Sequence, residues 1–449
     1  MTFPIRAAVR LTVGITLIAA GLIYGFTLPS TRWPPYDFLS RHLDVGAGQP
    51  GPAKRFTPKP GLTSPPPLTG LTRPDSAASP ASDATIDQLS ALGYLDGYEP
   101  AAQKTGVTVW KKDLTAPGVN LVMSGHAAEA ALMEMDGRII HRWNYRFSDA
   151  FPDAVVPADQ FHTQSWRRVR VLDDGGILAI FNGHGMIRLD RNSNLIWALP
   201  EHCHHDLDVA DDGTIRVLTQ RETLDPSVHA SKPILAEFIT EVSPDGHVIR
   251  QIPLLEAFRG SPYEPILSKM PPHGDVLHAN TLEIIRNTPA DPSSPFRPGR
   301  VLTSFRHLDA IALVDLKSEK IVWLLTGMWR YQHEPSLLEN GRILLFDNQG
   351  IKDRSRVIEL DPLTQTIHWN YDGTKENPLF SSTSGACHRL PNGNTLIIES
   401  NRGRTIEVTP EGTIVWEYVN PERAGKNKEL TAVLFDVERI AAFTGPDRR

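Results

Sequence analysis

The feature that most constrains the fold is an internal repeat that begins near residue 118 and continues towards the end of the chain. Its unit is a strand, a turn that ends in Gly, and a second strand, as in residues 337–346 and 390–398. Asn-Gly turns at Gly341 and Gly393 predict β-hairpins, because Gly accepts the positive φ that a tight turn requires. Weaker copies are centred on Gly175, Gly213 and Gly299.

A second hairpin follows each first one and usually closes on a tryptophan. The clearest copy ends at Trp416, and the others end at Trp143, Trp197, Trp323 and Trp369, while a copy at residues 241–246 lacks the tryptophan. Two hairpins make four strands, which is one blade of a β-propeller. From Trp323 to Trp369 to Trp416 the spacing is 46 and then 47 residues, a period typical of blades that a β-sandwich would not show. We expect an all-β fold of six blades, beginning near residues 118, 162, 204, 277, 332 and 384.

Composition agrees with a globular domain and excludes some functions. The 449 residues are 40% hydrophobic and 22% charged, enough to bury a core. A net charge of −6 gives no basic face for nucleic acid. Cys203 and Cys387 lack metal or redox spacing, and one disulfide between them remains an alternative to two free thiols.

The first 30 residues predict a membrane anchor. Arg6 and Arg10 precede an uncharged run at residues 11–28, whose length nearly spans a hydrocarbon layer of about 30 Å. A cleaved signal peptide is the alternative, but no clear small-x-small cleavage site precedes a mature start. Positive charge before the run predicts that the N-terminus is cytoplasmic and that the rest is periplasmic.

We interpret residues 31–85 as a linker. Residues 50–80 contain nine prolines, and a segment of this composition cannot bury enough apolar surface to fold. Residues 86–117, with a short apolar helix near 86–95, are interpreted as a segment that docks on the propeller, and residues 118–449 as the propeller itself.

Three consecutive blades place a histidine at one equivalent position. His333 lies eight residues before Gly341 and Asn348 seven after it, so antiparallel pairing brings both to one end of the blade. His205 and Gln220 flank Gly213 at the same offsets. In the next blade His278 takes the histidine position when matched from the start of its strand, and Arg306 lies seven residues after Gly299.

Because the innermost strands of a propeller surround its central channel, these side chains should converge at one mouth of it. A lone histidine is more often a buried structural residue. This is our interpretation of the histidines that do not share the repeat position, although two of them, His204 and His307, lie beside the ring and could support it; the set is His126, His162, His204, His307 and His388.

Three imidazoles and a guanidinium suit a group with several anionic oxygens, such as a sulfate or phosphate ester. Histidine also serves as nucleophile, acid or base near neutral pH. The sequence contains no phosphate-binding Gly loop and no Ser or Cys elbow.

These residues resemble those of the bacterial arylsulfate sulfotransferases. The motifs that carry the resemblance are His278-Ala-Asn280, residues 303–307 (Thr-Ser-Phe-Arg-His), Gln332-His333, residues 339–348 and the closing run from Gly393 to Tyr418. The resemblance covers roughly residues 118–422. It implies a six-bladed propeller that moves a sulfuryl group between phenols without a nucleotide donor, with no cofactor.

The resemblance also implies roles for individual residues. His333 would become transiently sulfated, a sulfohistidine, and His205, His278 and Arg306 would bind the sulfuryl oxygens or assist proton transfer. We expect Asn280, Asn348 and Gln220 to contact the substrate. The chain departs from well-known members in lacking room for their N-terminal β-sandwich, and its two cysteines do not match a closely spaced pair that some members have.

Two other functions remain open at this stage. The three histidines could hold Zn or Fe, although Arg306 beside a metal is unfavourable unless carboxylates offset it. Alternatively the propeller could be a cell-surface module that only binds a ligand or partner. The leading expectation is an aryl sulfotransferase acting on a small aryl sulfate and a phenol.

Arg6 and Arg10 generate a topology prediction. Alkaline phosphatase, which is active only outside the cytoplasm, should be active when fused to the C-terminus of the full chain. A fused reporter that works only in the cytoplasm should be silent, and its activity would contradict the predicted orientation. Reversing both charges (Arg6→Glu with Arg10→Glu) should weaken that orientation and serves as the control.

Overall fold

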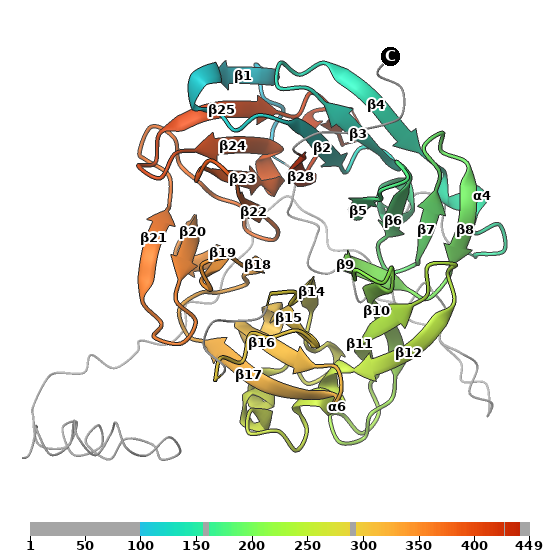
Figure 1. The fold of residues 1–449 in the computed structure, drawn as a ribbon. Coiled ribbons are helices and arrows are strands. Elements are labelled where there is room, and N and C mark those ends of the chain that lie inside the picture. Colours follow the sequence, from blue (N-terminus) through green and yellow to red (C-terminus); the bar gives the residue numbers. More distant parts are fainter. Residues whose placement is uncertain (1–98, 156–160, 288–292, 426, 441–449) are drawn as a thin grey trace, which may run out of the picture. The chain divides into compact units, whose positions relative to one another are not determined.

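The computed structural model describes residues 99–155, 161–287, 293–425 and 427–440. Six antiparallel sheets surround a common centre (Figure 1), which confirms the six-bladed β-propeller. The predicted anchor, the linker and the apolar helix near residues 86–95 lie outside the described residues. Within the described ranges, no helix has the length and apolar character needed to cross a membrane.

Blades 2 to 6 follow one another along the chain, and four consecutive strands of each run in sequence order from the centre outwards. Blade 2 contains β5 (Arg168–Val171), β6 (Ile177–Phe181), β7 (Gly185–Leu189) and β8 (Leu195–Leu199). Blade 3 contains β9 (Cys203–Val209), β10 (Ile215–Thr223), β11 (Ile234–Val242) and β12 (Val248–Pro253). Blade 4 contains β14 (Ala279–Ile284), β15 (Arg300–Phe305), β16 (Ala310–Asp315) and β17 (Lys320–Thr326).

The last two consecutive blades repeat this pattern. Blade 5 contains β18 (His333–Leu337), β19 (Ile343–Ile351), β20 (Arg354–Leu360) and β21 (Ile367–Tyr371). Blade 6 contains β22 (Ala386–Arg389), β23 (Thr395–Glu399), β24 (Arg404–Val408) and β25 (Ile414–Val419). Shorter pieces are β13 (Gly274–Asp275), β26 (Arg423–Ala424), β27 (Leu430–Thr431), α4 (Phe147–Ala150), α5 (Phe161–Gln164), α6 (Leu254–Phe258), η1 (Lys112–Leu114), η2 (Glu264–Lys269), η3 (Arg306–Leu308) and η4 (Ser400–Arg402).

Blade 1 differs from the sequence-based expectation that it begins near residue 118. Its innermost strand is β28 (Leu434–Ile440), from the far end of the described chain, and β2 (Val119–Ser124), β3 (Glu129–Met133) and β4 (Ile139–Asn144) follow outwards. In addition, β1 (Gly106–Trp110) pairs with β25 as a fifth strand of blade 6. Both ends of the described chain are thus built into sheets, which closes the ring and covers edges that would otherwise be unpaired.

The tryptophans that defined the period lie in the fourth strand of a blade, counted from the centre, and three of them link neighbouring blades. The indole Nε1 of Trp416 donates to the Met135 carbonyl of blade 1 at 2.9 Å. In the same way Trp197 donates to Pro244 at 3.1 Å and Trp369 to Pro410 at 2.7 Å. Each acceptor lies in the turn before the fourth strand of the next blade, so the repeated residue has a repeated structural purpose.

The hydrophobic core is divided into six clusters, each of which lies between two neighbouring blades. The cluster between blades 2 and 3 includes Leu178, Leu207 and Cys203, which is a free thiol, as is Cys387 in the cluster between blades 5 and 6. The apolar alternation of the strands is therefore satisfied by sheet-on-sheet packing around the ring.

Arg168 forms the centre of a buried ion network that joins the innermost strands. Its Nε lies 2.9 Å from Asp206 of blade 3, its Nη2 2.5 Å from Glu334 of blade 5 and its Nη1 2.5 Å from Asp436 of blade 1. Burial by itself would lower the pKa of Arg168, but the three carboxylates outweigh it and raise that pKa well above the usual range.

The remaining two blades join the same network through its carboxylates. The other oxygen of Asp206 accepts from the backbone amide of Leu282 in blade 4 at 2.8 Å. His388 of blade 6 lies 2.7 Å from Asp436, whose charge outweighs the effect of burial and raises the pKa of His388 to about 9. All six blades therefore contribute to one polar cluster, which we call the Arg168 hub.

Removing the cation from this hub should destabilise the fold strongly. Arg168→Met removes the guanidinium that pairs with Asp206 and Glu334 and leaves Asp436 paired with His388. This change should lower the free energy of unfolding, measured with guanidinium chloride, by about 3–5 kcal/mol. The difference in unfolding free energy between the variant and the wild type should become smaller as the pH falls, because protonation removes the repulsion between the carboxylates. Arg170→Met is the control: its side chain is 38% exposed and pairs with Glu438 at 3.5 Å, so it should cost less than about 1 kcal/mol. Equal losses in the two variants would contradict the role of the hub.

Candidate active site

The innermost strands of blades 3, 4 and 5 are irregular next to each predicted histidine. The pairing register shifts beside His205 in β9, immediately after His278 at the start of β14, and immediately after His333 in β18. His205 and His278 have φ values of 52° and 54°, a left-handed conformation that costs of order 1–3 kcal/mol and is concentrated at functional sites. Such bulges redirect side chains out of the regular alternation.

The structure brings the three histidines and Arg306 together, as the spacing predicted. The rings of His205 and His278 lie 4.8 Å apart between centroids, and the charges of Arg306 and His278 both act on His333. The three histidines are only 5, 7 and 2% exposed, in chain order. A substrate here would react in a largely water-free environment, where electrostatic effects are strong.

The tautomer of His333 follows from its hydrogen bonds. Its Nδ1 lies 2.9 Å from the carbonyl oxygen of Tyr331 and 2.8 Å from Oδ1 of Asn348. The Asn348 amide is oriented by its own Nδ2, which donates to the carbonyls of Ser381 and Ser384. Both neighbours of Nδ1 are acceptors, so Nδ1 carries the proton and Nε2 retains its lone pair. Burial, followed by the charge of Arg306, holds the pKa of His333 well below its usual value.

Arg306 is half-buried, and among the described residues it forms no ion pair with a carboxylate. Its backbone amide bonds to the carbonyl of His278 at 3.0 Å, which confirms the predicted pairing across the blade 4 hairpin. Its guanidinium lies 4.3 Å from the ring centroid of Tyr331 and donates to Nε2 of His307 at 3.1 Å. Its buried Nε has no hydrogen-bond partner within the described ranges, which indicates a place for an anionic ligand.

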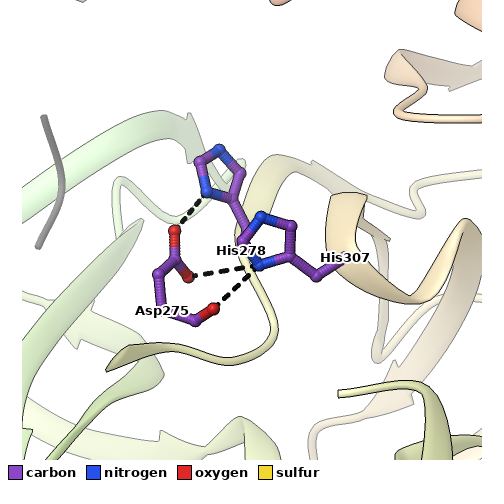
Figure 2. Close-up of side chains that lie close together, drawn as sticks. All are labelled: Asp275, His278 and His307. Atoms are coloured by element: carbon purple, nitrogen blue, oxygen red, sulfur yellow. Dashed lines mark hydrogen bonds and ion pairs between the residues drawn. The ribbon is translucent and has the colours of Figure 1, made fainter. Parts of the chain in front are cut away.

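Asp275 lies between two imidazoles (Figure 2). Its carboxylate accepts a hydrogen bond from Nδ1 of His278, and its backbone carbonyl accepts one from Nδ1 of His307 at 2.8 Å. Burial would raise the pKa of Asp275, but the charge and hydrogen bond of His278, together with the charge of His307, lower it to about 2. Asp275 is therefore a carboxylate at neutral pH.

Asp275, His278 and His307 also have the donor types and spacing of a metal site. Their other contacts argue against that use. His307 donates through Nδ1 to a carbonyl and accepts through Nε2 from Arg306, so neither ring nitrogen is available without breaking a hydrogen bond. A guanidinium next to that nitrogen would also repel a cation. The contacts of Asp275 and His307 are therefore better suited to orienting His278 and Arg306 than to binding a metal.

The remaining predicted residues hold the backbone around the site. Asn280 donates through Nδ2 to the carbonyl of Gln332 at 2.9 Å, which links blade 4 to the residue before His333. Gln220 is buried at the end of β10, where its backbone amide bonds to the carbonyl of His202 at 3.3 Å. Asn348, as described above, orients His333.

Three site residues were missed from the sequence. Arg167 is buried, lies 5.0 Å from the Phe435 ring and lowers the pKa of both His205 and His333 through its charge. Asp275 and Tyr331 lie in segments before the strands, where no repeat position identified them. For Asp275, the spacing along the chain could have indicated the contact. Asp275 precedes His278 by three residues, and a carboxylate at that distance can reach the ring.

Comparison with solved structures returns other proteins at low identity. A protein of unknown function from Bacteroides caccae has 13% identity and a TM-score of 0.46, with 71% of this chain and 99% of that chain covered. A streptogramin B lyase has 12% identity and a TM-score of 0.40, with 76% and 95% covered. The Dos1 propeller has 11% identity and a TM-score of 0.37, with 71% and 77% covered. No curated protein matches the chain.

Fold and site together define a six-bladed β-propeller with a buried histidine and arginine centre suited to an anionic group. A family model described as arylsulfotransferase (ASST) matches residues 168–421, more than half of the 449 residues. The chain belongs to the arylsulfotransferase family.

Arg306 generates the prediction for this site. Arg306→Lys keeps the charge but loses the planar fork, so aryl sulfate turnover should fall at least about tenfold, or about 1.4 kcal/mol in transition-state binding. The control is Arg330→Lys, because Arg330 also contacts the Tyr331 ring, at 4.8 Å, but is exposed. Unchanged kcat/KM in a folded Arg306→Lys protein would refute this assignment.

Proposed function

We propose that the protein transfers a sulfuryl group from an aryl sulfate to a phenolic acceptor, in two steps, through a sulfohistidine at His333. Membership in the arylsulfotransferase family supports the general activity. The observation that carries the mechanism is the pair of carbonyl oxygens at Nδ1 of His333, which leaves the lone pair on Nε2. An unprotonated imidazole nitrogen is a nucleophile without further activation.

In the first step, Nε2 of His333 attacks the sulfur of the donor. An N–S bond forms, the bond from sulfur to the aryl oxygen breaks, and the electron pair stays on that oxygen. The departing phenolate takes up one proton and leaves as a phenol. His333 is then a sulfated imidazolium whose Nδ1 proton remains bonded to Tyr331 and Asn348.

In the second step, an acceptor phenol loses its proton and its oxygen attacks the same sulfur. The N–S bond breaks and returns its electron pair to Nε2 of His333. The two steps together consume no proton and need no nucleotide or other cofactor. A double-displacement pattern in the kinetics follows, because donor and acceptor use the site in turn.

The cations around His333 supply the charge stabilisation. Arg306 lacks a carboxylate partner among the described residues, and Arg167 acts on His205 and His333 through its charge. Fixed positive groups in a buried site stabilise charge that develops on sulfuryl oxygens without reorganisation. His205 borders the same space, since its ring lies 4.8 Å from His278. Asn280 and Asn348 fix the segment and the tautomer of His333.

We also place this activity on the periplasmic side of a bacterial inner membrane, with residues 1–30 as a single-pass anchor and residues 31–85 as a spacer. The motivation is the pair Arg6 and Arg10 before an uncharged run. Donor and acceptor would then be small aryl molecules outside the cytoplasm, which suits a reaction that uses no nucleotide.

His333→Asn tests the central step. Wild-type protein mixed with 4-nitrophenyl sulfate alone should gain the mass of one SO3 group in intact-protein mass spectrometry, and His333→Asn should gain none. Because burial lowers the pKa of His333, sulfation should be constant around neutral pH and fall only well below pH 6.5.

The matched control is His205→Asn, which should react more slowly but still accumulate the sulfated protein. A His333→Asn protein that still gains one SO3 group would move the nucleophile to another histidine. Absence of transfer to phenol by the wild type would remove the proposed function itself. Elemental analysis of the purified protein checks the alternative of a metal site.

A further inference from the structure

The proposed reaction needs one group that gives a proton to the departing aryl oxygen and takes one from the acceptor phenol. His333 cannot do this, because its Nε2 bonds to sulfur and its Nδ1 is held by Tyr331 and Asn348. Arg306 cannot exchange protons near neutral pH either. The proton carrier must be another titratable side chain that borders the same space.

The ring of His278 is hydrogen-bonded to a carboxylate. Nδ1 of His278 donates to Oδ2 of Asp275 (Figure 2), and Asp275 is ionised and can only accept. This contact keeps the proton on Nδ1, so Nε2 is the nitrogen that exchanges a proton with a substrate. The negative charge of Asp275 also stabilises the imidazolium when Nε2 is protonated.

The other imidazoles near the site make different contacts. His205 faces His204 through a contact of 2.9 Å between their Nδ1 atoms, and burial holds the pKa of His205 well below its usual value. Burial also lowers the pKa of His307 to about 4, and its Nε2 accepts from Arg306. Neither is placed to carry a proton to and from an aryl oxygen at neutral pH.

Asp275 also helps to orient Arg306, the residue proposed to bind the sulfuryl oxygens. Its backbone carbonyl accepts from Nδ1 of His307, which leaves Nε2 of His307 to accept from Arg306. One residue therefore orients two groups: the carboxylate orients His278, and the backbone oxygen orients Arg306 through His307. A side-chain substitution at Asp275 removes the hydrogen bond to His278 and a longer contact, 3.9 Å, between Oδ1 and Nδ1 of His307. It leaves the backbone hydrogen bond to His307 in place, so the two roles can be separated by experiment.

The resemblance to the arylsulfate sulfotransferases already allows His278 to bind the sulfuryl oxygens or to assist proton transfer. We propose that Asp275 is the positioning residue that gives His278 the second role, so that the two act as the acid and base pair of this site. This inference rests on the proposed function. In the first step Nε2–H of His278 protonates the aryl oxygen as its bond to sulfur breaks. In the second step the same Nε2 takes the proton of the acceptor phenol as its oxygen attacks sulfur, which restores the starting state.

The test compares donors whose phenols differ in acidity. Proton donation matters most for a poor leaving group, so Asp275→Asn should slow enzyme sulfation by phenyl sulfate by about a hundredfold or more. The same variant should slow sulfation by 4-nitrophenyl sulfate less than about tenfold, because 4-nitrophenolate leaves without a proton. Equal slowing of both donors would mean a structural role for Asp275 and would overturn the proposal.

Two matched variants sharpen this comparison. His307→Asn should slow both donors to the same extent, since it disturbs Arg306 rather than the proton carrier. Asp245→Asn removes the same charge from an exposed pair with His247 at 3.7 Å and should change neither rate. If the wild type forms no sulfated enzyme with either donor, the proposed function fails; if it does and Asp275→Asn shows no dependence on the donor, only this inference fails.

A spectroscopic measurement tests the pair without turnover. The proton between Nδ1 of His278 and the Asp275 carboxylate should give a downfield proton resonance in the NMR spectrum of the wild type. That resonance should disappear in both His278→Asn and Asp275→Asn and persist in His205→Asn. A wild-type spectrum without it, or its persistence in Asp275→Asn, would contradict the hydrogen bond on which the proposal depends.

Discussion

The rest of the structure depends on the buried network around Arg168. Three carboxylates from three blades neutralise one guanidinium, and a backbone amide and a histidine connect the remaining blades. A buried cation with fewer partners would be costly, so each innermost strand must approach the centre closely enough to contribute. Packing between blades supplies most of the buried apolar area, but this network sets how the six sheets meet at the axis.

The hub also explains the position of the reactive histidines. Asp206 follows His205, and Glu334 follows His333, directly along the chain. In a regular strand consecutive side chains point to opposite faces, whereas the bulges allow the acid to reach Arg168 and the histidine to reach the site. The strained φ of His205, and that of Glu334 at 48°, is stabilised by these charge-assisted contacts.

Within the site, the histidines differ in the groups that their ring nitrogens contact, and this gives chemically identical side chains different properties. Carbonyl oxygens at Nδ1 leave His333 with its lone pair on Nε2, as the proposed nucleophile requires, and a carboxylate at Nδ1 of His278 suits the proposed proton carrier. His307 orients Arg306 because both of its nitrogens are engaged. His278 and His333 occupy the same position in the repeat, so the hydrogen-bond partner of each ring, and not its place in the repeat, distinguishes the two.

The sequence by itself determined the all-β class, the six blades, the convergence of His205, His278, His333 and Arg306, and the contact between His333 and Asn348. These follow from period and hairpin geometry, which are local. Only the tertiary structure decided the closure by β28, the Arg168 hub and the contacts of Asp275 with two imidazoles, because each depends on residues far apart in the chain or outside the repeat. Hydrophobic periodicity predicts strands and turns, but it does not predict which buried charged side chains come into contact at the axis.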